Sequence, residues 1–124
     1  MSVHSINHVQ LGFPAGRHAQ LRHFYSDLLG LTEVGTGDGK TLRFQAGTQR
    51  IDLVPVNDWR PPSQLPHLAL EVRNLQGLRA KLSDAGLALD ESRILPGHLR
   101  FYAQDPAGNG LEFLEPVGGQ GRAA

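Results

Sequence analysis

The sequence repeats itself at an offset of 57 residues, and this duplication restricts the fold more than any other feature of the chain. The triplet LRF at residues 42–44 recurs at residues 99–101. A carboxylate flanked by apolar residues follows each triplet, Asp52 in the first copy and Glu112 in the second. Repetition at a period of this size indicates two copies of one supersecondary unit.

Each copy has the pattern of a β-α-β-β-β unit. Mainly apolar runs at 8–13 and 66–72 predict the two opening strands. A helix with one apolar face follows the first run and ends at Gly30; the second helix begins at Asn74 as N-cap and ends at Gly86. The apolar face of the first helix consists of Leu21, Phe24, Tyr25, Leu28 and Leu29.

Three further strands are expected in each copy, and glycine-containing turns separate them. In the first copy the turns are GDG at 37–39 and AGTQ at 46–49. The expected strands are 31–36, 40–46 and 50–56 in the first copy and 88–94, 98–104 and 110–115 in the second.

The predicted fold class is therefore α+β, with two tandem βαβββ modules in a single domain spanning residues 1–124. Module one occupies 4–56 and module two 66–116, and the polar, proline-containing segment 57–65 joins them. The glycine-rich end, GGQGRAA at 118–124, is expected to fray.

Composition excludes several classes of protein. Twelve basic and twelve acidic residues balance, and no basic run indicates a nucleic-acid or membrane partner. The absence of cysteine excludes disulfides and a thiol nucleophile. No apolar stretch has membrane-spanning length, and the first residues lack the form of a signal peptide, so we expect a cytoplasmic protein.

Strand side chains alternate between the two faces of a sheet, and the polar phase carries four groups with metal-binding chemistry. These are His8 and Asp52 in the first copy and His67 and Glu112 in the second. Imidazole nitrogen and carboxylate oxygen together suit Zn, Ni, Mn or Fe. A single histidine on a strand is more often structural, but equivalent placement in both copies favours a shared metal site.

The same phase carries Arg43, Arg50, Arg100 and Gln10. Guanidinium and amide groups on one face suit an anionic substrate. Each of the three arginines taken alone is more often a solvated residue at a groove rim.

Four motifs resemble the vicinal oxygen chelate superfamily, which includes glyoxalase I, fosfomycin and bleomycin resistance proteins, methylmalonyl-CoA epimerase and extradiol dioxygenases. They are NHVQL at the first strand, FYSDLLGL at the helix end, HLAL at the second opening strand and DPAGNGLEFLEP near the end. The resemblance covers residues 4–116. It implies that the modules form curved mixed sheets, often in a homodimer that holds a metal in a concave groove.

The resemblance also assigns roles to individual residues. His8, His67 and Glu112 match the positions of metal ligands. Asp52 matches a position where glyoxalase I has a glutamate that is both ligand and base; because aspartate is one methylene shorter, Asp52 is a ligand, an unbound base or a plain strand residue. Tyr102 matches a tyrosine that faces the site of fosfomycin enzymes.

The function expected from these residues and motifs is that of a metal-dependent lyase or isomerase of the glyoxalase type. A divalent ion would chelate vicinal oxygens of a small substrate and stabilise an enediolate while Glu112 or Asp52 moves a proton. One alternative is a metal-free dimer that binds a drug or metabolite, as bleomycin resistance proteins do. A further alternative is an Fe(II) ring-cleaving dioxygenase. The retained ligand set favours an enzyme.

Overall fold

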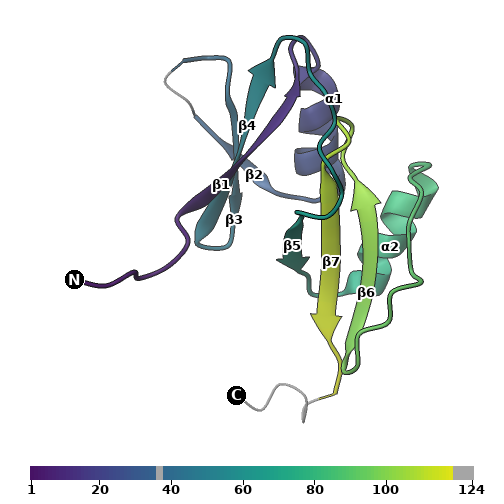
Figure 1. Cartoon of the computed structure of the whole chain (residues 1–124). Coiled ribbons are helices and arrows are strands. Elements are labelled where there is room, and N and C mark those ends of the chain that lie inside the picture. Colours follow the sequence, from purple (N-terminus) through teal and green to yellow (C-terminus); the bar gives the residue numbers. More distant parts are fainter. Residues whose placement is uncertain (36–37, 119–124) are drawn as a thin grey trace. The chain divides into compact units, whose positions relative to one another are not determined.

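The computed structural model describes residues 1–35 and 38–118 and contains two compact units (Figure 1). The first unit is Met1–Pro61 and the second begins at Pro62. The first residue of the turn predicted at 37–39 lies outside the described residues, and so does the predicted frayed tail beyond residue 118.

The first unit is built on a mixed four-stranded sheet in the order β1-β4-β3-β2. Its strands are β1 (His8–Pro14), β2 (Thr32–Val34), β3 (Leu42–Ala46) and β4 (Gln49–Val56). β1 runs parallel to β4, whereas β3 is antiparallel to both β4 and β2. A parallel pair needs a crossover connection, and the helical segment after β1 supplies it.

The helical segment of the first unit changes type along its length. It begins as α1 (His18–Arg22) and continues as the π-helix η1 (His23–Leu28), where the sequence pattern predicts an α-helix throughout. The Leu29 amide donates to the carbonyl of Phe24, a five-residue step that widens the turn. The wider turn buries the adjacent residues Phe24 and Tyr25 together, and Gly30 ends the segment with φ of +75°.

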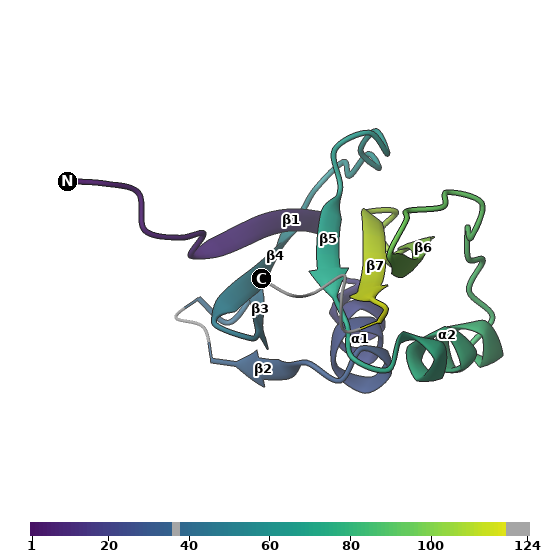
Figure 2. The same ribbon diagram turned by 90° about the horizontal axis from the view of Figure 1, so that it is seen from below.

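The second unit repeats the plan with a three-stranded sheet in the order β5-β7-β6. Its elements are β5 (Leu68–Glu71), α2 (Leu75–Asp84), β6 (His98–Gln104) and β7 (Gly110–Pro116). β5 is parallel to β7, and β6 is antiparallel to β7. The first unit has the same arrangement, with β1 parallel and β3 antiparallel to β4. The helix α2 lies beside the sheet of the second unit in both views (Figure 2). Asn74 caps α2 as predicted, its side chain accepting from the Gly77 amide at 3.2 Å.

The strand expected at 88–94 is reduced to one bridge between Asp90 and Tyr102. The Asp90 carboxylate accepts hydrogen bonds from the Ser92 amide at 2.9 Å and the Ser92 hydroxyl at 2.6 Å. This local turn diverts the backbone from the ladder, because a side chain that bonds nearby backbone competes with strand pairing. Residues 91–97 consequently form a loop alongside β6.

The cores confirm the predicted alternation of faces. In the first unit Phe44 faces Ile51 across β3 and β4, and both are buried. In the second unit Phe101 and Phe113 are register partners whose rings stack at 5.1 Å. The opposite phase carries the polar residues, so the α+β class with two mainly β modules is confirmed.

Candidate functional site

The second unit brings His67 and Glu112 into direct contact. Glu112 lies in the central strand β7, between Ala69 on β5 and Tyr102 on β6, and His67 immediately precedes β5. The His67 Nε2 atom is 2.7 Å from the Glu112 Oε1 atom. Glu112 is only 7% exposed, so this carboxylate is held in a defined position.

The hydrogen bond of the other ring nitrogen, Nδ1, determines the tautomer of His67. The Nδ1 atom of His67 lies 3.0 Å from the carbonyl oxygen of Leu65, and a carbonyl only accepts, so Nδ1 carries a proton. In a neutral ring Nε2 then presents a lone pair to a carboxylate oxygen at 2.7 Å. Two such atoms 2.7 Å apart share a proton. A metal ion bound by both atoms at about 2.0–2.2 Å would hold them roughly 3 Å or more apart, so it would have to displace this proton. A backbone carbonyl bonded to Nδ1 is also a common way to fix the tautomer of a metal-ligating histidine.

Three positively charged or donating groups surround Glu112. Arg100 Nη1 lies 3.4 Å from Glu112 Oε2, and the hydroxyl of Tyr102 donates to the carboxylate. Burial by itself raises the pKa of Glu112, but the hydrogen bonds from His67 and Tyr102 and the charges of Arg100 and His67 outweigh it and lower the pKa. Glu112 is therefore an anion at neutral pH and a suitable ligand for a cation.

In the first unit the equivalent carboxylate, Asp52, is engaged by arginine. Arg50, two residues earlier on β4, donates to both oxygens of Asp52 at 2.6 and 3.0 Å. Arg43, the register partner of Asp52 on β3, approaches to 3.8 Å. Its Nε atom is buried and has no hydrogen-bond partner within the described residues. Hydrogen bonds from Arg50 lower the pKa of Asp52; burial opposes the shift, and the charges of Arg50, Arg43 and His8 add to it.

Each unit thus carries two of the predicted ligands. In the second unit His67 contacts Glu112, whereas in the first unit Asp52 contacts arginine. His8 is exposed, with Nδ1 at 2.8 Å from the Asn7 side-chain oxygen, and its charge acts on Asp52. Gln10 is exposed opposite Asp52 in the register of β1 and β4. Within the described part of either unit, no third histidine, aspartate or glutamate joins its pair closely enough for three to share one ion.

The Asp52–Arg50 pair predicts a pH-dependent stability. Because the folded pKa of Asp52 lies below its usual 3.8, the pair stabilises the fold above about pH 3.8 and this stabilisation is lost as the pH falls through the folded pKa. Asp52→Asn is expected to cost about 1–3 kcal/mol at pH 7 and much less near pH 2. Urea unfolding across this range measures the difference. Asp27→Asn, at an exposed aspartate, is the control, and a cost for Asp52→Asn that is independent of pH would refute the assignment.

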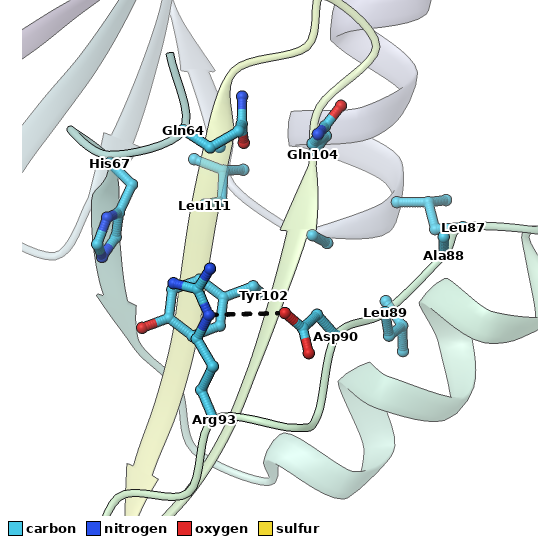
Figure 3. Close-up of a pocket in the computed structure, with 12 residues that line it drawn as sticks. Gln64, His67, Leu87, Ala88, Leu89, Asp90, Arg93, Tyr102, Gln104 and Leu111 are labelled. Atoms are coloured by element: carbon cyan, nitrogen blue, oxygen red, sulfur yellow. Dashed lines mark ion pairs between the residues drawn. The ribbon is translucent and has the colours of Figure 1, made fainter.

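A pocket of about 520 Å³ opens beside His67 and Tyr102, entirely within the second unit (Figure 3). The segment at residues 87–93 forms one side of it and the ends of β6 and β7 form another. Sequence reasoning missed Gln64, Asp90 and Arg93 as lining residues. Asp90 and Arg93 fall in the segment whose pattern predicts a regular strand, and no motif marks this segment as part of a site.

Trp59 belongs to the first unit, and its indole packs against Gly12 on the polar face of β1. A side chain at position 12 would collide with the ring, so glycine is required for this contact. Trp59 therefore covers one end of the face that carries His8 and Gln10.

The fold agrees with comparison to known proteins. A model of the Glyoxalase/Bleomycin resistance protein/Dioxygenase superfamily matches residues 5–113. The chain belongs to this superfamily. No significant match was found among curated proteins. None of the helices in residues 1–35 and 38–118 has the length and apolar character needed to span a bilayer.

Several solved structures are similar to this chain in fold. A protein from Bacillus anthracis assigned to the glyoxalase family is 26% identical, with a TM-score of 0.86 over 94% of this chain and 98% of that one. A lactoylglutathione lyase from Agrobacterium tumefaciens is 21% identical, with a TM-score of 0.69 over 90% and 92%. An antibiotic-binding protein from Streptomyces is 20% identical, with a TM-score of 0.73 over 94% and 99%. Enzymes and binding proteins therefore both occur on this fold.

Proposed function

We propose that this chain is a metal-dependent enzyme of the glyoxalase type, a lyase or isomerase that acts on a small substrate with vicinal oxygens. The observation that supports this proposal most strongly is the arrangement of His67 and Glu112. The Nε2 and Oε1 atoms lie 2.7 Å apart, and the Leu65 carbonyl holds Nδ1, so Nε2 and Oε1 are the two atoms that would bind a metal ion when it displaces the proton between them.

His67 and Glu112 would hold the ion, and His8 remains a predicted further ligand. Asp52 is the least suitable of the four predicted ligands, because both of its oxygens already accept hydrogen bonds from Arg50. This mixture of nitrogen and oxygen donors suits Zn, Ni, Mn or Fe. When bound, such an ion acts as a Lewis acid that stabilises negative charge on a substrate oxygen.

The surrounding side chains have distinct tasks in this proposal. Arg100 and Tyr102 fix the Glu112 carboxylate, and Tyr102 also lines the pocket in which a substrate would lie. A proton next to a carbonyl would be moved by Glu112, since both oxygens of Asp52 already accept hydrogen bonds from Arg50. Arg43, Arg50 and Gln10 remain candidates for binding an anionic group of the substrate.

Elemental analysis tests the proposal. Protein purified without chelator should contain close to one equivalent of a transition metal, and His67→Ala should lower that content at least about fivefold because Nε2 is removed. His98→Ala is the control, since His98 lies in the same unit and its ring contacts only the Pro96 carbonyl among the hydrogen bonds described. Wild-type protein that takes up no metal, or equal metal content in all three proteins, would refute the proposal.

A second candidate is a metal-free dimer that binds a drug or metabolite. The Asp52–Arg50 pair favours it, because a carboxylate already neutralised by a guanidinium has no need of a metal ion. This candidate predicts that ligand binding is unchanged by chelator and by His8→Ala. Calorimetric titration before and after dialysis against EDTA distinguishes the two candidates.

A further inference from the structure

The pocket of the second unit combines two kinds of wall. Leu87 and Leu89, both partly exposed, form an apolar side together with Ala88. His67, Tyr102, Arg93 and Asp90 form a polar side, and the Asp90 carboxylate accepts hydrogen bonds from Ser92. In Figure 3 the Arg93 side chain crosses in front of Tyr102, with Asp90 and Leu89 beside it. A volume of about 520 Å³ is within the range of small-molecule sites, and such sites typically join apolar walls to a few polar groups.

The Arg93 guanidinium is weakly held, although its backbone is fixed. The backbone carbonyl of Arg93 accepts two hydrogen bonds from Arg100, at 2.8 and 3.0 Å. The guanidinium lies 4.7 Å from the centre of the Tyr102 ring and 3.7 Å from Asp90, and its side chain is 57% exposed. An exposed pair at 3.7 Å contributes little, so an anionic ligand can take the guanidinium from Asp90 at small cost.

The Arg100 guanidinium, unlike that of Arg93, is firmly held. Its guanidinium is committed to the Arg93 carbonyl and to Glu112, and it is 16% exposed. Arg100 therefore links the loop at 91–97 to the proposed metal-binding carboxylate, whereas Arg93 presents a positive charge to the pocket. Arg93 is thus the better placed of the two arginines to meet a ligand.

We propose that this pocket selects small organic acids that carry an aromatic or branched apolar group, with Arg93 binding the carboxylate and the leucine wall taking the apolar group. The inference rests on the proposed function in one respect, namely that such an acid is the substrate. It names the substrate class of the same site. It also identifies Arg93 and Leu89 as specificity-determining residues.

Mandelate and lactate test the apolar wall. Both probes carry the same α-hydroxycarboxylate, so any bound metal contributes equally to the two, and the ratio of their dissociation constants reports on the phenyl group. Calorimetric titration of the full-length protein as purified should give at least about tenfold tighter binding of mandelate, from the apolar surface that the ring buries. Leu89→Ser should reduce this ratio to less than about threefold.

Mandelamide tests the role of charge. Arg93→Gln should weaken mandelate binding about five- to tenfold and leave the neutral mandelamide unchanged, because a charge-assisted hydrogen bond is lost only with the anion. Arg79→Gln is the matched control, since Arg79 is exposed in the same unit and neither it nor its partner Glu91 is among the residues that line the pocket. It should change neither affinity.

Equal affinity for mandelate and lactate, or mandelate binding that survives Arg93→Gln unchanged, would overturn the inference. Its failure is distinguishable from failure of the proposed function. A protein that holds metal but does not prefer mandelate refutes the substrate class alone. A protein that prefers mandelate through Arg93 but takes up no metal refutes the metal-dependent enzyme and leaves the pocket assignment standing.

Discussion

Replacing Glu112 with glutamine is expected to lower the affinity of the protein for Zn²⁺ by at least about 100-fold. Removing a residue that only hydrogen-bonds a metal ligand lowers metal affinity about 10–100-fold. Glu112→Gln removes an anionic ligand itself, so we expect a larger loss. The substitution keeps the size of the side chain, and the amide oxygen still accepts the hydrogen bond from Tyr102. Competition titration against a chromophoric chelator at neutral pH measures the affinity.

Two further variants make this result specific. Glu91→Gln is the same chemical change at an exposed carboxylate of the same unit, which Arg79 binds at 2.6 and 2.8 Å, and it should leave the affinity unchanged. Asp52→Asn should lower the affinity less than about threefold, because the oxygens of Asp52 already accept from Arg50. If Glu112→Gln binds Zn²⁺ as tightly as the wild type, Glu112 is not a metal ligand. If Asp52→Asn instead lowers the Zn²⁺ affinity strongly, Asp52 is a metal ligand.

The duplication explains why so much of the fold is predictable. Once Asp52 and Glu112 are aligned as equivalent positions, the two opening strands and the closing hairpins follow from the same pattern. Strand alternation then predicts that Asp52 shares a face with Arg43 and Arg50 in the first unit and that Glu112 shares one with Arg100 in the second, where the family resemblance adds Tyr102. The register confirms this, since Asp52 pairs with Arg43 and Glu112 pairs with Tyr102.

The features that the sequence pattern does not predict depend on the rotamers of single side chains and on the local geometry of turns. The alternation rule places Arg50 and Asp52 on one face, but whether they bond each other or a ligand depends on side-chain rotamers. The π-helical turn around Phe24 and Tyr25 has the apolar spacing of an ordinary helix. The loop at 91–97 replaces a strand because Asp90 bonds Ser92, and with it Arg93 enters the pocket.

The turn after β6 is expected to carry an unusually large share of the stability of the second unit. Asp105 is 4% exposed, and its Oδ1 atom accepts from the amides of Ala107 at 2.8 Å and Asn109 at 3.0 Å. Its Oδ2 atom accepts from the Asn109 side-chain amide at 2.9 Å. This network holds the DPAGNG sequence in the tight turn that leads into β7, and so it also positions Glu112.

Asp105→Ala is therefore expected to destabilise the protein by about 3–5 kcal/mol, because three donors lose their acceptor, and Ala107 and Asn109 are themselves buried. Asp38→Ala is the matched control. Asp38 also accepts three hydrogen bonds, from the Lys40 and Thr41 amides and the Thr41 hydroxyl, but in an exposed turn.

Water replaces the lost acceptor at Asp38, so the expected cost there is about 0.5–1.5 kcal/mol. Urea unfolding followed by circular dichroism compares the two variants. Equal costs would mean that burial does not set the value of the Asp105 network. The turn would then be an ordinary connection between β6 and β7, and the position of Glu112 would have to be attributed to the pairing of β7 with its neighbours alone.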